Sequence, residues 1–277
     1  MIKVAFQGES GAYSEEAAKK YFEEKIRTVP CQTFADIFKT ISKGVDFGVV
    51  PIENSIEGNV TQAYDLILRF GFPIVGEVIH KISHCLIANR GVRIGAVKKV
   101  YSHPQALGQC REYLERMGFS AIPEYDTAGS VKLIKEKAIT DGAAIAGRGA
   151  AEIYGMDILA SEIETNKKNF TRFFVISKKA SKAPQDGIGF KTSVAFSTKH
   201  SPGALYNAIG CFANNGINLT YIQSRPILGK PWEYNFYLDC EGSISEPKIK
   251  GAVAALGTFS SFVKVLGSYQ GAGKSGE

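Results

Sequence analysis

The feature that most constrains the fold is a regular alternation of short apolar runs with amphipathic stretches over residues 1 to about 178. The first instance is VAF followed by YSEEAAKKYFEE, and the last is AAIA followed by RGAAEIYG. Apolar runs of this length indicate buried strands, and the periodic stretches between them indicate helices. Strands that alternate with helices build largely parallel sheets with helices on their faces. We therefore expect an α/β fold.

The alternation is broken at residues 74–88, which read IVGEVIHKISHCLIA. Apolar and β-branched residues dominate this stretch and no helical period follows it, so it is expected to be extended. An extended segment of this length suits a crossover between two lobes. We expect a two-lobed, periplasmic-binding-protein-like catalytic domain with an interlobe cleft over residues 1–179, with lobes of about 1–78 plus 160–179, and 79–159.

The pattern changes after a charged, proline-containing segment, and we place a linker at residues 180–189. Residues 190–270 then carry four apolar runs and two helical stretches in the order β-α-β-β-α-β. This is the order of the ferredoxin-like split motif, so an α+β domain is expected, with Pro202 in the first turn of its first helix. The closing residues 271–277, GAGKSGE, are expected to be disordered.

Composition excludes several classes of function. The 33 basic and 27 acidic residues give a formal charge of +6, and both signs are intermixed along the chain, which indicates a solvated surface and not a nucleic-acid stripe. The N-terminus MIKVAFQG lacks the apolar stretch of a secretory signal, and no uncharged run reaches the roughly 18 residues of a membrane helix. We expect a cytoplasmic protein without nucleic-acid or membrane partners.

Cysteine and histidine spacing predicts neither disulfides nor a metal site. The five cysteines are far apart and stand in apolar or helical sequence, as buried free thiols do. No pair has zinc-ligand spacing, and His80 and His84 fall in the extended stretch, not on one helix face. Two glycine-rich segments also fail as nucleotide motifs: GAGKSGE lacks the first glycine of a phosphate loop, and GRGAAE at Gly147 has Glu152 in place of a third glycine. GRGAAE is better explained by helix packing.

Polar residues gather where the expected strands end. QGESGAYS, PIENS, YSHPQ and YDTAGS each follow a strand, and NFTRF opens the returning one. Taken singly, these residues suit helix caps. Ligands of open α/β sheets, however, bind beyond the carboxyl ends of the strands, and Arg172 could clamp a carboxylate through two parallel hydrogen bonds. A small organic acid held between two lobes is the inference.

At these residues the chain resembles the prephenate dehydratases of phenylalanine biosynthesis. The motifs are GAYSEEAA, VPIENSIEG, SHPQALGQC, DTAGS and NFTRF, in that order. Beyond the linker, GALYNAIGCFANNGINLTYIQSRP resembles the ACT domain with which these enzymes sense phenylalanine. The resemblance implies decarboxylative dehydration of prephenate to phenylpyruvate, carbon dioxide and water by a hydro-lyase that uses no cofactor or metal, with feedback by L-phenylalanine through the ACT domain.

The resemblance also implies site residues. Thr171 is expected to be central to catalysis and to hydrogen-bond the leaving hydroxyl. The further residues expected at the catalytic site are Asn54, Ser102, Gln105 and Glu53, and those expected to bind substrate are Arg172, Phe173, Ser14, Tyr13, Ser55, His103 and Thr127. We expect Asn54, Ser102 and Gln105 to complete a polar network around Thr171.

An effector pocket is implied at an interface between paired ACT domains, in a homodimer or homotetramer. Its expected residues are Gly203, Ala204, Leu205, Asn218, Leu219, Gln223, Ser224, Arg225 and Pro226. One departure stands out, because the family commonly has glutamate at the position of Gln223. Loss of that charge bears on the strength of phenylalanine inhibition.

Two alternatives remain open from the sequence. Related dehydratases prefer arogenate, the amino analogue of prephenate, and QGESGAYS and AAEIYG are also found in that branch. The second alternative is a small organic-acid binding module without activity, because two lobes around an anion describe such modules equally well.

Overall fold

The computed structural model describes residues 1–277 except 24–25, 181–188, 200, 228 and 274–277. The chain divides into two compact units, residues 1–60 with 79–173 and residues 61–78 with 174–277. Most of the predicted linker at 180–189 and the last four residues of the predicted disordered tail lie outside the described residues.

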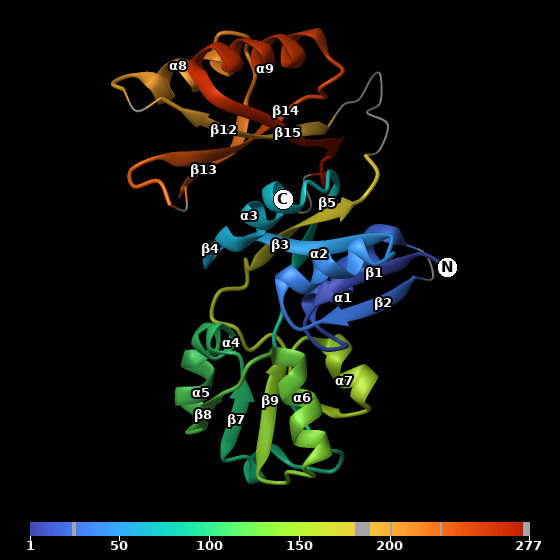
Figure 1. Ribbon diagram of the computed structural model, residues 1–277. Coiled ribbons are helices and arrows are strands. Elements are labelled where there is room, and N and C mark those ends of the chain that lie inside the picture. Colours follow the sequence, from blue (N-terminus) through green and yellow to red (C-terminus); the bar gives the residue numbers. More distant parts are fainter. Residues whose placement is uncertain (24–25, 181–188, 200, 228, 274–277) are drawn as a thin grey trace. The chain divides into compact units, whose positions relative to one another are not determined.

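The first lobe of the first unit is built on a six-stranded sheet with the order β2-β1-β3-β11-β5, in which β4 also pairs with β3 (Figure 1). Strand β1 pairs in parallel with both β2 and β3. Strands β5 and β11 run on from this lobe into the second unit. The elements are β1 (Lys3–Gln7), α1 (Tyr13–Phe22), β2 (Arg27–Cys31), α2 (Phe34–Ser42), β3 (Phe47–Asn54), β4 (Gly58–Asn59), β5 (Ile74–Lys81) and β11 (Phe170–Ser177).

The second lobe of this unit has a five-stranded sheet with the order β10-β6-β9-β7-β8. The elements are β6 (Cys85–Ala88), η1 (Ile94–Ala96), β7 (Lys99–Ser102), α4 (Pro104–Gln109), α5 (Arg111–Met117), β8 (Ser120–Pro123), α6 (Thr127–Glu136), β9 (Gly142–Ala146), α7 (Arg148–Tyr154) and β10 (Asp157–Ala160). Strand β7 is parallel to β8 and β9, whereas β6 is antiparallel to β9 and β10. The sheet is therefore mixed. The chain enters the lobe through β6 and leaves it through β10.

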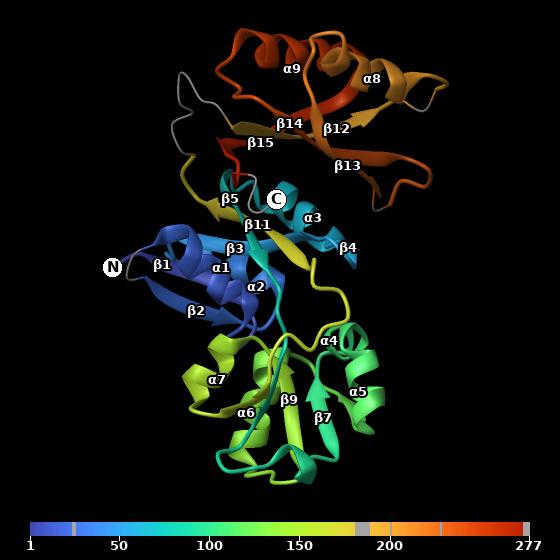
Figure 2. The same ribbon diagram turned by 180° about the vertical axis from the view of Figure 1, so that it is seen from behind.

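Two connections join the lobes, and the structure confirms that residues 74–88 form an extended crossover. The segment after β5 and the segment before β11 run side by side, as Figure 2 shows. The Ile82 N–H donates to the Asn169 carbonyl at 2.8 Å, and the Ile163 N–H donates to the His84 carbonyl at 3.1 Å. These two backbone hydrogen bonds join the two connecting segments.

The GRGAAE glycines pack helix α7 against the first lobe, as the sequence predicts. A Cβ atom on Gly147 would lie 2.9 Å from the Tyr13 ring, and one on Gly149 would lie 2.5 Å from Glu16 Oε1. A side chain at either glycine would force the Tyr13 ring or the Glu16 carboxylate to shift. The Gly149 N–H also donates to Glu16 Oε1 at 3.2 Å, so the two lobes approach closely at this point.

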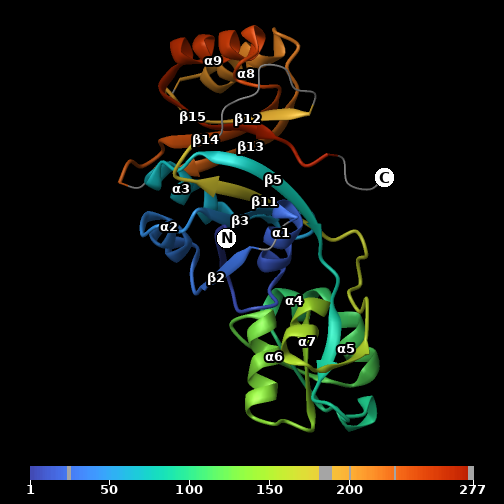
Figure 3. The same cartoon turned by 90° about the vertical axis from the view of Figure 1, so that its right-hand side faces the viewer.

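The second unit contains the predicted β-α-β-β-α-β domain, with an antiparallel sheet of order β13-β14-β12-β15. Its helices α8 and α9 lie on the same face of this sheet (Figure 3). The elements of the unit, in addition to the ends of β5 and β11, are α3 (Thr61–Phe70), β12 (Phe190–Thr198), α8 (Ala204–Ala213), β13 (Leu219–Pro226), β14 (Tyr234–Glu241), α9 (Pro247–Phe259) and β15 (Ser260–Gln270).

The prediction that Pro202 lies in the first turn of helix α8 is wrong. The helix begins at Ala204, and its N-cap is Gly203 with a φ of 76°. A left-handed residue interrupts helical geometry, so the proline precedes the helix. Glycine is the residue that adopts this conformation without steric cost.

Helix α3 lies on the face of the four-stranded sheet opposite to α8 and α9. Side chains alternate along a strand, so Leu238 joins the core beneath α8 and α9 while Tyr237 and Asp239 face α3. The Tyr64 ring of α3 stacks on Tyr237 with centroids 4.9 Å apart, and its hydroxyl donates to Asp239 Oδ2 at 3.1 Å. Ser193 Oγ donates to the same carboxylate at 2.6 Å, so this buried carboxylate accepts hydrogen bonds from two hydroxyl groups.

All five cysteines are buried and free, which confirms the prediction from their spacing. Burial raises the pKa of the Cys110 thiol far above its ordinary value. In the part of the chain that the structure describes, no helix is both long and apolar enough to span a bilayer.

Candidate active site

Two polar side chains of the first unit meet where β3 ends and β11 begins. Asn54 is the last residue of β3, and Thr171 follows the first residue of β11. The Asn54 amide Nδ2 donates a hydrogen bond of 2.9 Å to Thr171 Oγ1 and one of 2.7 Å to Asn169 Oδ1. Thr171 is buried, at 8% exposure, so water competes little for this contact.

The turn after β3 fixes the orientation of the Asn54 amide. Its Oδ1 accepts hydrogen bonds of 2.9 Å from the backbone N–H groups of Ile56 and Glu57. A backbone N–H can only donate, so Oδ1 must face the turn and Nδ2 must face Thr171. Thr171 Oγ1 therefore accepts from Asn54, and the hydroxyl hydrogen can be donated to a third group. This suits a threonine that hydrogen-bonds an oxygen of a bound molecule.

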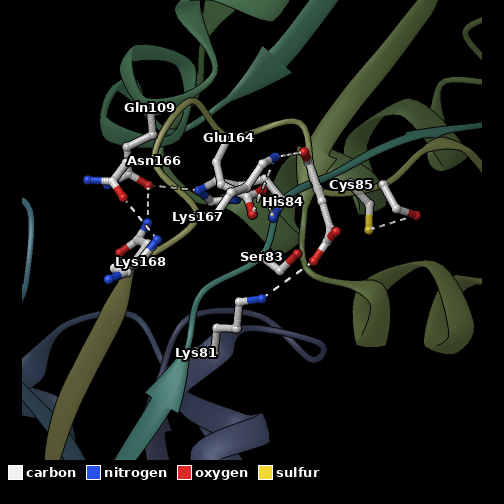
Figure 4. Close-up of polar contacts among 12 residues, drawn as sticks. Lys81, Ser83, His84, Cys85, Gln109, Glu164, Asn166, Lys167 and Lys168 are labelled. Atoms are coloured by element: carbon white, nitrogen blue, oxygen red, sulfur yellow. Dashed lines mark hydrogen bonds and ion pairs between the residues drawn. The ribbon is translucent and has the colours of Figure 1, made fainter. Parts of the chain in front are cut away.

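A further amide side chain comes from the second lobe. Gln109, the last residue of α4, projects toward the connection between the lobes (Figure 4). Its Oε1 accepts from Asn169 Nδ2 at 2.9 Å, and its Nε2 donates to Glu57 Oε1 at 3.2 Å. Asn54, Asn169 and Gln109 thus form one row of hydrogen-bonded amides across the two lobes, with Thr171 at its end.

Sequence reasoning missed Asn169 and Gln109 and placed Gln105 in this network. Gln105 is exposed, and its backbone N–H donates to His103 Nδ1 at 3.3 Å. The two glutamines lie about one turn apart on α4, so only the placement of that helix decides which of them reaches the first lobe. Both missed residues stand inside recognised motifs, SHPQALGQC and NFTRF, which is the signal that could have found them.

Ser102 is also engaged differently from the predicted network. Its side chain is fully buried, and Oγ donates to the Ile145 carbonyl at 2.6 Å. This bond joins the ends of two neighbouring strands, β7 and β9, within the second lobe. The residue that caps helix α4 is His103. The described hydrogen bonds that Asn54 Nδ2 donates reach residues 169–171 and neither Ser102 nor Gln105.

Arg172 and Glu53 form a second pair in the same region, where β3 ends and β11 begins. Arg172 Nε lies 3.4 Å from Glu53 Oε2, with the arginine side chain 10% exposed and the glutamate side chain 41% exposed. Successive side chains of a strand point to opposite faces, so Arg172 leaves β11 on the face opposite to Thr171. The Thr171 hydroxyl and the Arg172 guanidinium are adjacent in sequence but lie on opposite faces of the sheet. The continuous burial of residues 171–177 confirms that NFTRFFVI forms a buried strand.

The remaining predicted substrate residues have different surroundings. Phe173 is 2% exposed and belongs to the core, and Ser14 is buried in the first turn of α1. Ser55 Oγ accepts from the Phe170 N–H at 2.9 Å and so closes the turn opposite β11. Thr127 begins α6, whose N-cap is Asp126. Tyr13 is half-buried, and its hydroxyl points into the connection between the lobes.

Asp126 places a buried carboxyl where the second lobe meets the loop after β1. Its Oδ1 accepts from the Gly129 N–H at 2.6 Å, which caps α6 as the sequence suggests. Gly8 has a φ of 114°, and a Cβ atom there would lie 2.9 Å from Asp126 Oδ2, so a side chain at this position would strain the backbone and displace the carboxyl. Burial raises the pKa of the Asp126 carboxyl above its ordinary value of 3.8, against the lowering effect of that hydrogen bond.

A cavity of about 440 Å³ lies elsewhere in the first unit, between α1, α7 and the lobe connection. Its lining residues are Tyr13, Glu16, His80, Lys81, Ser83, Cys85, Arg148, Ser161 and Glu162. Tyr13 is the predicted site residue that contributes to it, whereas Asn54 and Thr171 do not. The two glutamates that line the cavity already have partners. Glu16 Oε2 lies 2.9 Å from His80 Nε2, and Glu162 Oε1 lies 3.4 Å from Lys81 Nζ.

The predicted effector residues fall at three places in the second unit, and Asn218 and Leu219 lie where β13 begins. Gly203, Ala204 and Leu205 form the entry to α8, whereas residues 223–226 form the end of β13. Gln223 Oε1 accepts from the Tyr221 hydroxyl at 2.6 Å. Arg225 is committed to α3, because its Nη2 donates to Asp65 Oδ2 at 2.8 Å.

Comparison with known proteins agrees with these motifs. The family model of prephenate dehydratase matches residues 4–181. The chain belongs to the prephenate dehydratase family. It is therefore assigned to the carbon–oxygen lyases, as the motifs imply. It is 41% identical to arogenate dehydratase/prephenate dehydratase 2, chloroplastic, of Arabidopsis thaliana, over 97% of this chain and 72% of that protein.

Two solved structures are similar over almost the whole chain. The prephenate dehydratase of Arthrobacter aurescens in complex with L-Phe has a TM-score of 0.89 and 30% identity, covering 100% of this chain and 92% of that one. A protein described as GqqA, a novel type of quorum quenching acylases, has a TM-score of 0.92 and 33% identity, covering 98% of both chains. The two-lobed α/β catalytic domain followed by a ferredoxin-like ACT domain is thus the fold of this family.

Proposed function

We propose that the chain converts prephenate to phenylpyruvate, carbon dioxide and water, and that Thr171 hydrogen-bonds the hydroxyl that leaves the ring. The observation that carries this role is the 2.9 Å hydrogen bond from Asn54 Nδ2 to Thr171 Oγ1, with the Asn54 amide held by two backbone N–H groups. It leaves the threonine hydrogen directed away from Asn54 and available to the substrate oxygen.

The reaction needs orientation more than a strong acid. The ring C–O bond breaks, and the electron pair of the bond to the departing carboxylate completes an aromatic ring. Carbon dioxide leaves, and the released hydroxide takes up a proton to become water. Aromaticity drives this step, so preorganised donors aimed at the leaving oxygen supply the main catalytic effect. A threonine hydroxyl donates a hydrogen bond there without changing its own ionisation state.

Arg172 is proposed to bind a carboxylate of the diacid at the edge of the sheet where β11 begins. Its neighbour Glu53 lies 3.4 Å away and orients the guanidinium. We expect Arg172→Lys to raise the KM for prephenate about 10- to 100-fold, because an ammonium cannot make two parallel hydrogen bonds, with kcat changed much less. Steady-state kinetics checks this. The matched control Arg111→Lys, at an exposed arginine paired with Glu115, should change neither constant; equal KM values for Arg172→Lys and wild type would contradict the role.

The substrate is tested by assaying prephenate and arogenate side by side with the purified protein. The two differ in a keto group against an ammonium group on the side chain. A higher kcat/KM for prephenate supports the proposal, and a higher value for arogenate supports the alternative of direct phenylalanine formation; the name of the Arabidopsis relative includes both activities. Tight binding of prephenate without formation of phenylpyruvate would instead show a binding module.

Acylase activity is not favoured by the geometry at Thr171. Acyl transfer needs a nucleophile activated by a neighbouring base. In the described part of the chain, the side chain that is hydrogen-bonded to the Thr171 hydroxyl is the amide of Asn54, which donates to it and is not a base. A third assay with an acyl amide is expected to show no turnover.

L-Phenylalanine is proposed as the effector, bound at an interface between paired ACT domains of a homodimer or homotetramer. The entry of α8 and the end of β13 would supply the pocket, and the Arthrobacter structure with L-Phe supports this ligand class. The free, buried cysteines suit a reducing compartment, and we propose that the protein works in the cytoplasm.

Gln223 is expected to weaken feedback because an amide cannot neutralise the ammonium of phenylalanine. Gln223→Glu should lower the phenylalanine concentration for half-inhibition about tenfold, since a charged acceptor makes a stronger hydrogen bond. Titration of turnover with phenylalanine measures this, with D-phenylalanine as the control ligand. An unchanged or higher half-inhibition concentration in Gln223→Glu would contradict the expectation.

A further inference from the structure

His84 lies in the connection between the two lobes of the first unit and contacts Gln109, the last amide of the row. It is 2% exposed, and Figure 4 shows its ring beside Gln109 and Glu164. His84 Nε2 lies 2.8 Å from Gln109 Oε1, and Nδ1 lies 2.8 Å from the Tyr13 hydroxyl. Its backbone N–H donates to Glu164 Oε2 at 2.9 Å, which holds the residue in place.

The direction of each hydrogen bond in the row follows from the fixed orientation of Asn54. Because Asn54 Nδ2 donates to Asn169 Oδ1, the Asn169 amide must turn its Nδ2 toward Gln109. The atom of Gln109 that receives this bond must be Oε1. The same Oε1 faces His84 Nε2, so the histidine can complete the contact only by donating.

The opposite tautomer would break the row. A bare Nε2 needs a donor, and Gln109 could supply one only by turning its Nε2 toward the histidine. That amide nitrogen would then face Asn169 Nδ2, placing two donors against each other. Asn169 could not turn in response, because Asn54 Nδ2 lies on its other side and is held by the backbone.

Tyr13 faces the other ring nitrogen of His84. Gln109 Oε1 requires a hydrogen on His84 Nε2, so in the neutral ring Nδ1 carries none and can only accept. Burial lowers the pKa of His84 below its ordinary value of 6.5, against the opposing effects of Gln109 and Glu164, and so favours the neutral ring. The single hydrogen of the Tyr13 hydroxyl is within reach of both His84 Nδ1, at 2.8 Å, and the Ser83 carbonyl, at 2.9 Å, so Tyr13 does not by itself fix the tautomer.

We propose that His84 is a positioning residue for the dehydratase reaction. Its Nε2–H donates to Gln109 Oε1 and so stabilises the orientation that Asn54 and Asn169 impose on the Gln109 amide. The row in turn supports Asn54 in its contact with Thr171. His84 touches neither the threonine nor the sheet edge, and it acts through the row. This inference rests on the proposed role of Thr171.

The tautomer is measured first, in the whole wild-type protein, by ¹⁵N NMR of labelled histidine. The chain has four histidines, and the signal absent from His84→Gln identifies His84. We expect a protonated Nε2 and an unprotonated Nδ1 at pH 7. A protonated Nδ1 with a bare Nε2 would overturn the proposal, whatever the activity of the enzyme.

Kinetics provides the second test through two variants of similar size. His84→Leu removes the donor to Gln109, whereas the side-chain amide of His84→Gln can place an N–H near the position of Nε2. We expect His84→Leu to lower kcat for prephenate about tenfold with little change in KM, and His84→Gln to keep kcat within about threefold of wild type. Equal losses in both variants, or normal turnover in His84→Leu, would refute a positioning role. A wild-type protein inactive on prephenate would refute the proposed function instead, and the NMR result would still stand.

Discussion

Thr171→Val is expected to lower kcat for prephenate by about 10² to 10³-fold, the usual cost of removing one preorganised donor from a developing negative oxygen. Valine keeps the branched shape of threonine, so the buried start of β11 should still pack. The hydrogen bond from Asn54 Nδ2 would be lost together with the one donated to the leaving hydroxyl. Because both effects act on the reacting oxygen more than on binding of the diacid, KM should change little.

The matched control is Thr171→Ser, which keeps the hydroxyl and removes only a methyl group. It should retain most of the wild-type kcat, measured by the appearance of phenylpyruvate. Near-normal turnover in Thr171→Val would exclude the hydroxyl from the chemical step. Thermal unfolding of both variants separates a loss of catalysis from a loss of fold.

Asn54→Asp is expected to lower kcat by about 10²-fold or more. The aspartate can still accept from the backbone N–H groups of Ile56 and Glu57, so the turn after β3 should survive. An ionised carboxylate cannot donate, however, and it would face the oxygens of Thr171 and Asn169, which now receive a hydrogen bond from Asn54. Its charge would also repel a doubly negative substrate, so KM should rise as well.

An equivalent change at an exposed site is the control for this variant. Asn166 Oδ1 accepts from the Lys168 N–H at 2.9 Å, and Asn166→Asp keeps that acceptor and should leave both constants unchanged. The double variant Asn54→Asp with Thr171→Val should lose little more than the worse single variant, because the two residues act as one unit. Losses that simply multiply would show that Asn54 acts separately from Thr171.

Local sequence patterns were enough to predict the architecture. The period of the apolar residues distinguishes strands from helices in residues 1–178, and the same signal gives the order of the ferredoxin-like domain. The opposite faces of Thr171 and Arg172 also follow from strand geometry. The motif resemblance identified the family, and it identified Asn54 and Thr171, which the structure brings into contact.

Tertiary structure decided the remaining partners, because those contacts join segments far apart in the chain. Gln109 and Gln105 have the same chemistry and stand four residues apart, and only the placement of α4 brings Gln109 to Asn169. The Ser102 hydroxyl is directed to Ile145 by the pairing of β7 with β9, which no local pattern contains. The sequence by itself determined which residue types are present and which elements form. The direction of each hydrogen bond from Asn54 to His84 was decided by packing, since a side-chain amide or imidazole can donate or accept until fixed neighbours leave one arrangement.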